Sequence, residues 1–250
     1  MIMKQYNIIF FALLFTASSL WAQTKAQADS AYINKDYAQA IEIYESLLQE
    51  GESGEIYYNL GNAYFKQDEL GRAILNYERA LLLQPGNADV SANLDIARAK
   101  TIDKVNPNPE VFFVAWTRAL INLLPVDTWG GLGVVFFLCS LAALAIYLFT
   151  KGVRWRKIGF FTAFISLILC VITNLFAFEQ KGKIDHRTDA IVLSPSVTVR
   201  STPNEEGTSL FVIHEGRKVF IKDNSMKDWK EITLEDGKVG WIPVSAIEII

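Results

Sequence analysis

Two cysteines are the residues with the clearest capacity for covalent chemistry, and both lie in strongly apolar sequence. Cys139 and Cys170 each fall well inside a long uncharged segment, so an antiparallel pairing of the two segments would bring the thiols to a similar depth. Such a pair suggests a thiol redox relay inside a membrane as one hypothesis. The alternative, and the commoner role of free cysteines, is that both thiols pack at helix interfaces as small apolar groups.

The polar parts of the sequence contain no motif typical of catalysis or metal binding. Neither His186 nor His214 has a cysteine, a second histidine or paired acids at zinc-ligand spacing, and His214 is expected on the surface at the end of a strand. No nucleophile with an adjacent base, phosphate-binding loop or paired-acid cleft stands out. We therefore expect no catalytic residue, no metal and no cofactor.

Charge and apolar residues are unevenly distributed along the chain. Of its 250 residues, 51% are hydrophobic and 20% are charged, and the formal net charge is -3. Residues 23–106 and 179–250 are both acidic on balance, so neither has the basic surplus that a nucleic-acid partner requires. The apolar excess lies at the start and in the middle, which excludes a single soluble enzyme domain.

The first 22 residues have the pattern of a secretory signal peptide. Lys4 supplies a short positive region, residues 8–20 are apolar, and Ala22 offers a small residue at the cleavage site. An uncleaved signal anchor is the alternative for residues 1–22. Both interpretations place the chain from residue 23 onward outside the cytoplasm.

Two uncharged segments, residues 129–150 and 158–178, are each long enough to cross a bilayer as a helix. The segment between them, residues 151–157, is predicted to be a cytoplasmic loop by the positive-inside bias. Its basic residues are Lys151, Arg154, Arg156 and Lys157. The sequence thus predicts a multi-pass membrane protein in which both polar domains are extracytoplasmic.

A further apolar helix is expected at residues 109–124, just before the first span. Asn108-Pro109-Glu110 has the pattern of an N-cap followed by a first helical turn, and Pro125 closes the segment. Arg118 and Asn122 form a narrow polar stripe on this helix. We expect an amphipathic helix that lies at the outer face of the membrane. A helix packed under the preceding domain is the alternative.

Residues 54–87 carry a fixed-offset pattern of small, aromatic and apolar residues. Small residues let two helices approach closely, aromatic rings fill the space between them, and a proline stops the second helix. The pattern consists of Tyr57, Leu60, Gly61, Tyr64, Ala73, Tyr77, Ala80 and Pro85. It resembles the 34-residue tetratricopeptide repeat (TPR), a helix-turn-helix unit.

Neighbouring sequence extends the repeat in both directions. Upstream, a similar but shorter pattern indicates a degenerate repeat at residues 25–52, and downstream a partial match indicates a capping helix at 88–104. The TPR domain is thus assigned to residues 23–104. Because each repeat buries its apolar side only against a neighbour, we expect this small domain to rest on the 109–124 helix or on a partner.

The resemblance implies a concave face, formed by the first helix of each pair, on which TPR modules bind peptides or helices. In this sequence that face would present Tyr58, Asn59, Asn62, Lys66, Asn93 and Lys100. Asparagine amides can hydrogen-bond an extended backbone, and the lysines can attract a carboxylate. The alternative is a solvated polar face without a ligand.

From about residue 189 the pattern changes to short runs of period two, separated by turn residues. Five or six short strands in this segment predict a small β barrel. Residues 197–203, 214–216 and 240–243, together with Trp229, resemble a bacterial SH3 (SH3b) domain that covers residues 185–250. The resemblance implies a groove for cell-wall peptides or protein segments, with Trp229 and Trp241 as candidate lining residues or, alternatively, as half-buried structural residues.

The sequence therefore predicts a multidomain protein with an all-α TPR helical repeat, a two-helix transmembrane hairpin and an all-β SH3-like barrel. The order of these modules resembles the BatE family of the bacterial aerotolerance (Bat) operon. This resemblance implies a bacterial cytoplasmic (inner) membrane protein with periplasmic domains. It also implies partners among Bat-type von Willebrand A domain proteins and a MoxR-type AAA ATPase, in tolerance of oxygen or oxidative stress.

Three hypotheses for function remain. The first is a non-enzymatic scaffold that binds a Bat partner through the TPR groove. The second is a cell-wall tether whose SH3b domain grips peptidoglycan. The third is the membrane thiol redox relay through Cys139 and Cys170.

Overall fold

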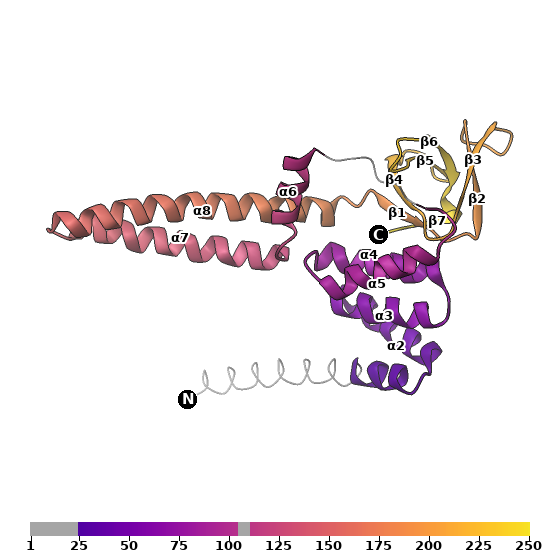
Figure 1. Ribbon diagram of the computed structural model, residues 1–250, viewed down its shortest axis with the longest axis horizontal. Coiled ribbons are helices and arrows are strands. Elements are labelled where there is room, and N and C mark those ends of the chain that lie inside the picture. The colour runs from indigo at the N-terminus through magenta and orange to yellow at the C-terminus, as the bar shows by residue number, and fades with distance from the viewer. Residues whose placement is uncertain (1–24, 105–110) are drawn as a thin grey trace, which may run out of the picture. The chain divides into compact units, whose positions relative to one another are not determined.

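The computed structural model describes residues 25–104 and 111–250 (Figure 1). The expected signal peptide, residues 1–22, and the expected helix start Asn108-Pro109-Glu110 lie outside the described residues. The chain divides into two compact units. One unit contains most of the helical repeat together with the C-terminal sheet, and the other contains Leu82–Asn87 and Pro109–Arg187.

The N-terminal region is a series of helices joined by short turns. A helix at residues 25–33 is followed by α2 (Tyr37–Glu50), α3 (Gly54–Lys66), α4 (Leu70–Leu83) and α5 (Ala88–Lys100). The side chains of Asp36 and Ser53 cap α2 and α3 by accepting hydrogen bonds from backbone N–H groups in the first turn. The helical, TPR-like character expected from the sequence is confirmed.

The turns inside the two successive helix pairs share an unusual backbone geometry. Lys35 has a φ of 64° and Asp68 a φ of 62°, and the two residues occupy equivalent places 33 residues apart. This left-handed conformation is uncommon for residues other than glycine, asparagine and aspartate. Its repetition supports the interpretation that residues 25–52 form a degenerate copy of residues 54–87.

Close approach between α3 and α4 explains the small residues of the repeat pattern. A Cβ atom on Gly61 would lie 2.7 Å from two ring carbons of Tyr77, so only glycine fits there without movement of the ring. Ala73 and Ala80 are fully buried, and Leu60 and Tyr64 are nearly so. α4 ends at Leu83, two residues before Pro85.

The C-terminal region is an antiparallel sheet of seven strands. They are β1 (Asp189–Val192), β2 (Ser196–Arg200), β3 (Ser209–His214), β4 (Lys218–Asp223), β5 (Trp229–Thr233), β6 (Val239–Pro243) and β7 (Ile247–Ile249). The strand order is β3-β2-β6-β5-β4-β1-β7, with β3 and β7 at the two ends. Alternate residues such as Val199, Ile232 and Ile242 are fully buried in one core.

The antiparallel β region is thus confirmed, but its details differ from the expectation. The sheet has seven strands rather than five or six, because the short strand β7 pairs with β1 after a single 3-10 turn at Val244–Ala246. The region also begins later than residue 185, since helix α8 continues to Asp185.

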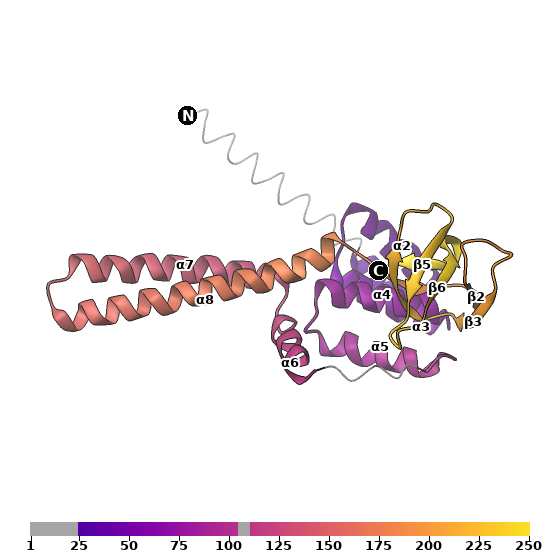
Figure 2. The same ribbon diagram turned by 90° about the horizontal axis from the view of Figure 1, so that it is seen from above.

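The second unit is dominated by two long helices that lie side by side (Figures 1 and 2). It contains α6 (Phe112–Ile121), α7 (Val126–Phe149) and α8 (Val153–Asp185). A Cβ atom on Gly159 of α8 would lie 2.8 Å from the backbone oxygen of Ala143 in α7. Ser140 donates a hydrogen bond to the backbone oxygen of Ala163 across the same seam, at 3.0 Å.

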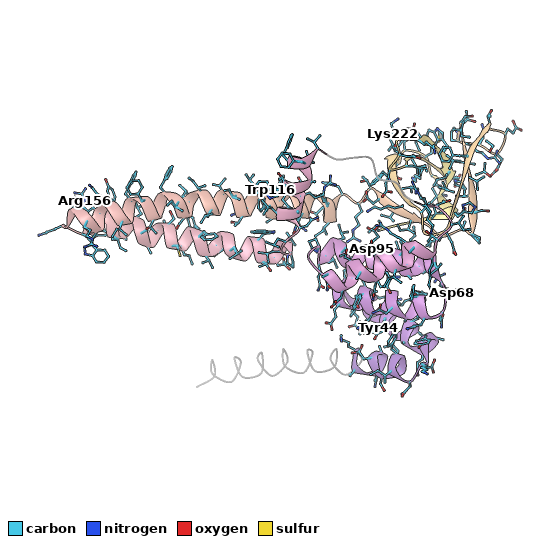
Figure 3. The ribbon with its side chains drawn as sticks, in the orientation of Figure 1. Tyr44, Asp68, Asp95, Trp116, Arg156 and Lys222 are labelled. Carbon is cyan, nitrogen blue, oxygen red and sulfur yellow. The ribbon has the colours of Figure 1, made fainter. Side chains whose placement is uncertain are left out.

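By length and composition, α7 and α8 are each long and apolar enough to cross a membrane. The expected basic loop at 151–157 is wrong in one respect. Of these seven residues only Lys151 and Gly152 lie between the helices, because α8 begins at Val153. Arg154, Arg156 and Lys157 therefore project from the first turns of a helix, and Arg156 lies at the connected end of the hairpin (Figure 3).

The helix before the first long helix also differs from its prediction. α6 begins at Phe112, and its N-cap residue, Val111, makes no side-chain hydrogen bond. It ends at Ile121, three residues before the expected end. Its large apolar side chains, Phe112 and Trp116 among them, are exposed (Figure 3).

Candidate partner-binding surfaces

Three of the predicted concave-face residues are joined by hydrogen bonds. Asn62 Oδ1 accepts from Tyr77 Oη at 2.8 Å and from Asn93 Nδ2 at 2.9 Å, and Asn93 Nδ2 is also 3.1 Å from Tyr58 Oη. The network links α3, α4 and α5. Asn62 Oδ1 and Asn93 Nδ2 already have hydrogen-bond partners inside the repeat. These two side chains therefore stabilise the packing of the helices in addition to forming part of the surface.

A second network centres on Asp29 in the first helix. Its carboxylate accepts hydrogen bonds from Lys25 Nζ at 2.9 Å, Tyr44 Oη at 2.6 Å and Asn59 Nδ2 at 3.3 Å. Partial burial alone would raise the pKa of Asp29, but these donors, Tyr44 first, lower it below its usual range. Burial and the same contact raise the pKa of Tyr44. The arrangement keeps an ionised carboxylate beside Asn59 at neutral pH.

These two networks meet at a cavity of about 360 Å³ on the helical repeat. Tyr44, which lies within the helical stack in Figure 3, contributes to its wall. The lining residues are Lys25, Asp29, Tyr32, Ile33, Tyr44, Glu55, Asn59 and Asn62. Ile33 is 77% exposed at this site and presents an apolar side chain to the solvent.

Four of the six predicted residues, Tyr58, Lys66, Asn93 and Lys100, do not line the cavity, and only Asn59 and Asn62 do. Lys66 is exposed, and Lys100 Nζ lies 4.4 Å from the ring centre of Phe65. The lysine that does line the cavity is Lys25, which pairs with Asp29 and Glu55. The cavity lining carries one lysine and two acidic residues, so its net charge is negative. It therefore does not provide the attraction for a carboxylate that was expected from Lys66 and Lys100.

Sequence reasoning missed Lys25, Asp29 and Tyr44 as surface-forming residues. The repeat spacing could have indicated Tyr44, because it stands 33 residues before Tyr77. The hydroxyl groups of both tyrosines donate hydrogen bonds to a polar side chain, Asp29 for Tyr44 and Asn62 for Tyr77. The degenerate first repeat obscured it.

On the sheet, Trp229 and Trp241 lie on one face, opposite to the core. Trp229 pairs with Pro243 and Trp241 pairs with Glu231, so the two rings are diagonal neighbours on adjacent strands. Both side chains are half-buried. This is compatible with either of the two roles expected for them.

The sheet and the helical repeat meet at a buried cluster of charges. Glu78 of α4 is 8% exposed; its carboxylate lies 3.0 Å from Lys218 Nζ of β4 and also pairs with Arg98 of α5. Lys218 is also 3.0 Å from Asp189. Burial lowers the pKa of Lys218, but Glu78 and Asp189 outweigh it and raise the pKa above its ordinary value.

Further polar contacts join the same two regions. Asp103 accepts from the backbone N–H of His214 at 2.8 Å and lies 2.8 Å from its Nδ1 atom. Arg79 pairs with Glu248 at 2.9 Å and donates to the backbone oxygen of Ile249 at 2.6 Å. The expectation that His214 is a simple surface residue is wrong. The repeat rests on the sheet, which sequence analysis did not predict.

The two cysteines are free thiols in different surroundings. Cys139 is exposed on α7, whereas Cys170 is half-buried on α8 beside Asn174, whose Nδ2 lies 3.7 Å from the sulfur and 2.8 Å from the backbone oxygen of Cys170. These contacts fix Asn174 locally and supply no redox partner, so the relay hypothesis gains no support from them.

Comparison with protein families gives a match to one part of the chain. The family model of the tetratricopeptide repeat matches residues 54–87, which are the α3–α4 pair and the turn after it. A comparison with curated proteins finds no match. A repeat of this family suggests a scaffold for protein-protein interaction. Residues 54–87 therefore form a tetratricopeptide repeat.

Proposed function

We propose that this protein is a membrane-anchored scaffold that binds a partner protein on its helical repeat and acts by binding rather than by catalysis. The observation that carries the proposal is the 360 Å³ cavity on a TPR-containing region, where Asn59, Asn62 and the Asp29 carboxylate lie beside exposed Ile33. An acidic, amide-rich wall with an apolar neighbour suits a peptide segment that carries a basic side chain.

Crosslinking from the cavity tests this proposal. A photoreactive residue at Ile33 should capture a partner in intact cells, and the double change Asn59→Ala and Asn62→Ala should reduce the yield severalfold. A photoreactive residue at Ile96 is the matched control, because Ile96 is also exposed but does not line the cavity. Equal capture from both positions, or capture unaffected by the double change, would contradict the proposal.

The membrane anchor is the α7–α8 hairpin in this proposal, with the basic residues near its connected end in the cytoplasm and both polar regions outside. The length and composition of the two helices support it, as does the positive-inside bias of Lys151, Arg154, Arg156 and Lys157. Protease added to spheroplasts should digest both the repeat and the sheet. Protection of both regions until the membrane is permeabilised would overturn the orientation.

The cellular setting we propose is a Bat-type complex of the bacterial inner membrane, with von Willebrand A domain proteins as partners and a role in aerotolerance or oxidative stress. The module order of the sequence supports this setting. Affinity purification of the crosslinked species from Ile33, followed by mass spectrometry, identifies the partner. If the recovered proteins contain no von Willebrand A domain, the Bat-type setting is excluded.

A second candidate function is attachment to peptidoglycan through the sheet, closed into an SH3-like barrel. The position of Trp229 and Trp241 on one solvent-facing side of adjacent strands favours it. Detergent-solubilised full-length protein should then pellet with cell-wall sacculi, and the change of both tryptophans to alanine should abolish pelleting. Unchanged pelleting of the double variant would exclude this face.

A further inference from the structure

The α7–α8 hairpin carries an open groove of about 830 Å³ near the end at which α7 begins. Its lining includes Val171, Leu175 and Phe178 of α8 and Gly130 and Gly131 of α7. A Cβ atom on either glycine would have no neighbour within 4 Å, so the space in front of them is open. Another helix could therefore approach the backbone of α7 closely at this place.

Asn174 places an amide in the wall of this groove. Its side chain is exposed, although it lies within the apolar part of α8, inside the expected span 158–178. Its Nδ2 atom donates to the backbone oxygen of Cys170 at 2.8 Å, but among the described residues no donor reaches its Oδ1 atom. The hydrocarbon core of the membrane proposed above contains no water that could satisfy this acceptor. An exposed amide at this depth therefore indicates a polar partner from outside the hairpin.

Two exposed residues of opposite charge, Asp127 of α7 and Lys181 of α8, also line the groove. Asp127 makes no ion pair within the described part of the chain. Lys181 pairs with Asp185 at the surface, where the two side chains are 60% and 47% exposed, so this pair is weak and leaves two ammonium donors free. The rings of Trp129 and Phe176 lie 5.1 Å apart, which shows that these ends of the two helices are nearly level. The acid and the base are therefore at a similar depth.

The groove is complementary to itself. When two copies are related by a two-fold axis along the membrane normal, Asp127 of each copy meets Lys181 of the other. The two Asn174 amides then face each other, and each can donate to and accept from its counterpart. A phospholipid could pair its headgroup with the two charges, but its acyl chains offer no hydrogen bond to Asn174. A helix of another protein would need an acid, a base and an amide at matching depths, which a second copy has by symmetry.

We propose that this groove is the interface at which a second copy of the chain docks, so that the protein is a dimer in the membrane. Paired rim charges and an amide contact below them hold the two hairpins together. The inference rests on the membrane anchor of the proposed function. It is independent of the partner site near Ile33.

Energy transfer between labelled copies of the full-length chain in phospholipid vesicles tests the interface. Donor and acceptor dyes are attached behind Ile250 on two populations, which are mixed before reconstitution. The transfer should persist when the chain is diluted about tenfold in lipid, whereas transfer from chance proximity falls with dilution. A dilution series gives the dissociation constant, and Asn174→Leu should raise it at least fivefold because the amide contact is lost.

Exchange of the rim charges identifies the contact itself. Asp127→Lys and Lys181→Glu each place like charges opposite each other in a symmetric pair, so each variant should associate with itself at least tenfold more weakly. A mixture of these two variants should regain most of the association, because every contact between the two copies then joins an acid to a base. Lys183→Glu makes the same change of charge at a residue that does not line the groove, and it should associate like the unchanged chain.

Washing the vesicles with alkaline carbonate separates a failure of the anchor from a failure of the interface. Protein that washes off would contradict the membrane anchor and, with it, the interface. Protein that is retained but shows no transfer above chance, as expected if lipid fills the groove, would overturn the interface alone. Full association of both single charge variants, or a mixture of them that associates no better than each variant by itself, would place the contact elsewhere on the chain and would also overturn the proposal.

Discussion

The two units of this protein place their large and small side chains in opposite ways. The repeat-sheet unit buries Tyr77, Ile74 and Ile232, and its buried Glu78 is paired with Arg98 and Lys218. In the α7–α8 hairpin the buried positions are small or polar, such as Gly159 and Ser166, and the exposed ones are large and apolar. The contrast shows that water drives the packing of the first unit, whereas the hairpin packs by close backbone contact and suits an apolar solvent.

The largest effect on this contrast should come from Glu78. The change Glu78→Ala leaves Arg98 and Lys218 without their shared buried partner, so we expect the repeat-sheet unit to lose about 3–5 kcal/mol of unfolding free energy. Urea titration of the full chain in detergent, read by hydrogen exchange of peptides from α4 and β4, measures it. The control Glu205→Ala, at an exposed pair with Arg200, should cost less than about 1 kcal/mol. Similar losses in both variants would mean that burial of the cluster is unimportant.

A matched pair of glycine changes should separate the two units. Gly61→Ala pushes against the ring of Tyr77, and Gly159→Ala pushes against the backbone of Ala143, each within 3 Å. We expect each change to cost about 1–3 kcal/mol, and hydrogen exchange should rise only in the helices of the affected unit. Gly130→Ala, where a Cβ atom would have no neighbour within 4 Å, is the control. Faster hydrogen exchange in α3 of the Gly159→Ala variant would contradict the independence of the two units.

Alkaline pH should weaken the repeat-sheet unit. Burial, together with its hydrogen bond to Glu45, raises the pKa of the Tyr64 hydroxyl from 10.0 to about 12, and the pKa of Lys218 is also raised. The folded state then holds protons that the unfolded state has lost, so the unfolding free energy falls as pH rises from 10 to about 12. Urea midpoints of the full chain between pH 8 and 12 measure the fall, and Tyr64→Phe should make it shallower. An unfolding free energy that rises between pH 10 and 12 would contradict the raised pKa values of Tyr64 and Lys218 in the folded state.

The smallest expected effects lie in the two left-handed turns. Lys35→Gly should stabilise the repeat by about 0.5–1 kcal/mol, because glycine adopts a positive φ without steric strain. Asp68→Gly should gain less, since aspartate tolerates this conformation better than lysine. Thermal unfolding of the two single variants measures the difference. A larger gain at Asp68 would mean that its turn is held by something other than backbone geometry.

The parts of the fold that could be predicted are those with local patterns. The spacing of Gly61, Ala73 and Tyr77 indicates a helix pair because all three meet across one turn, and alternation identifies six of the seven strands. The strand that was missed, β7, has three residues and is specified by its pairing with β1, far away in the sequence.

Long-range ionic contacts are the parts that could not be predicted. Glu78 and Lys218 are 140 residues apart, and Asp103 and His214 are 111 apart. A buried carboxylate and an exposed one look the same in a sequence, and only the fold decides which finds a partner. For the same reason the candidate cavity residues Asn59 and Asn62 were foreseeable from the repeat, whereas Asp29 and Lys25 were not.

The unbroken course of α8 has a mechanical consequence. At 1.5 Å per residue its 33 residues form a rod of about 50 Å, and no proline interrupts it. The apolar stretch accounts for about 30 Å of this length. The last seven residues, Glu179 to Asp185, extend it by about 10 Å and are stiffened by the ladders Lys183–Glu179 and Lys181–Asp185. Such a helix has a fixed length and no flexible point along it, so a displacement of one end is transmitted to the other end.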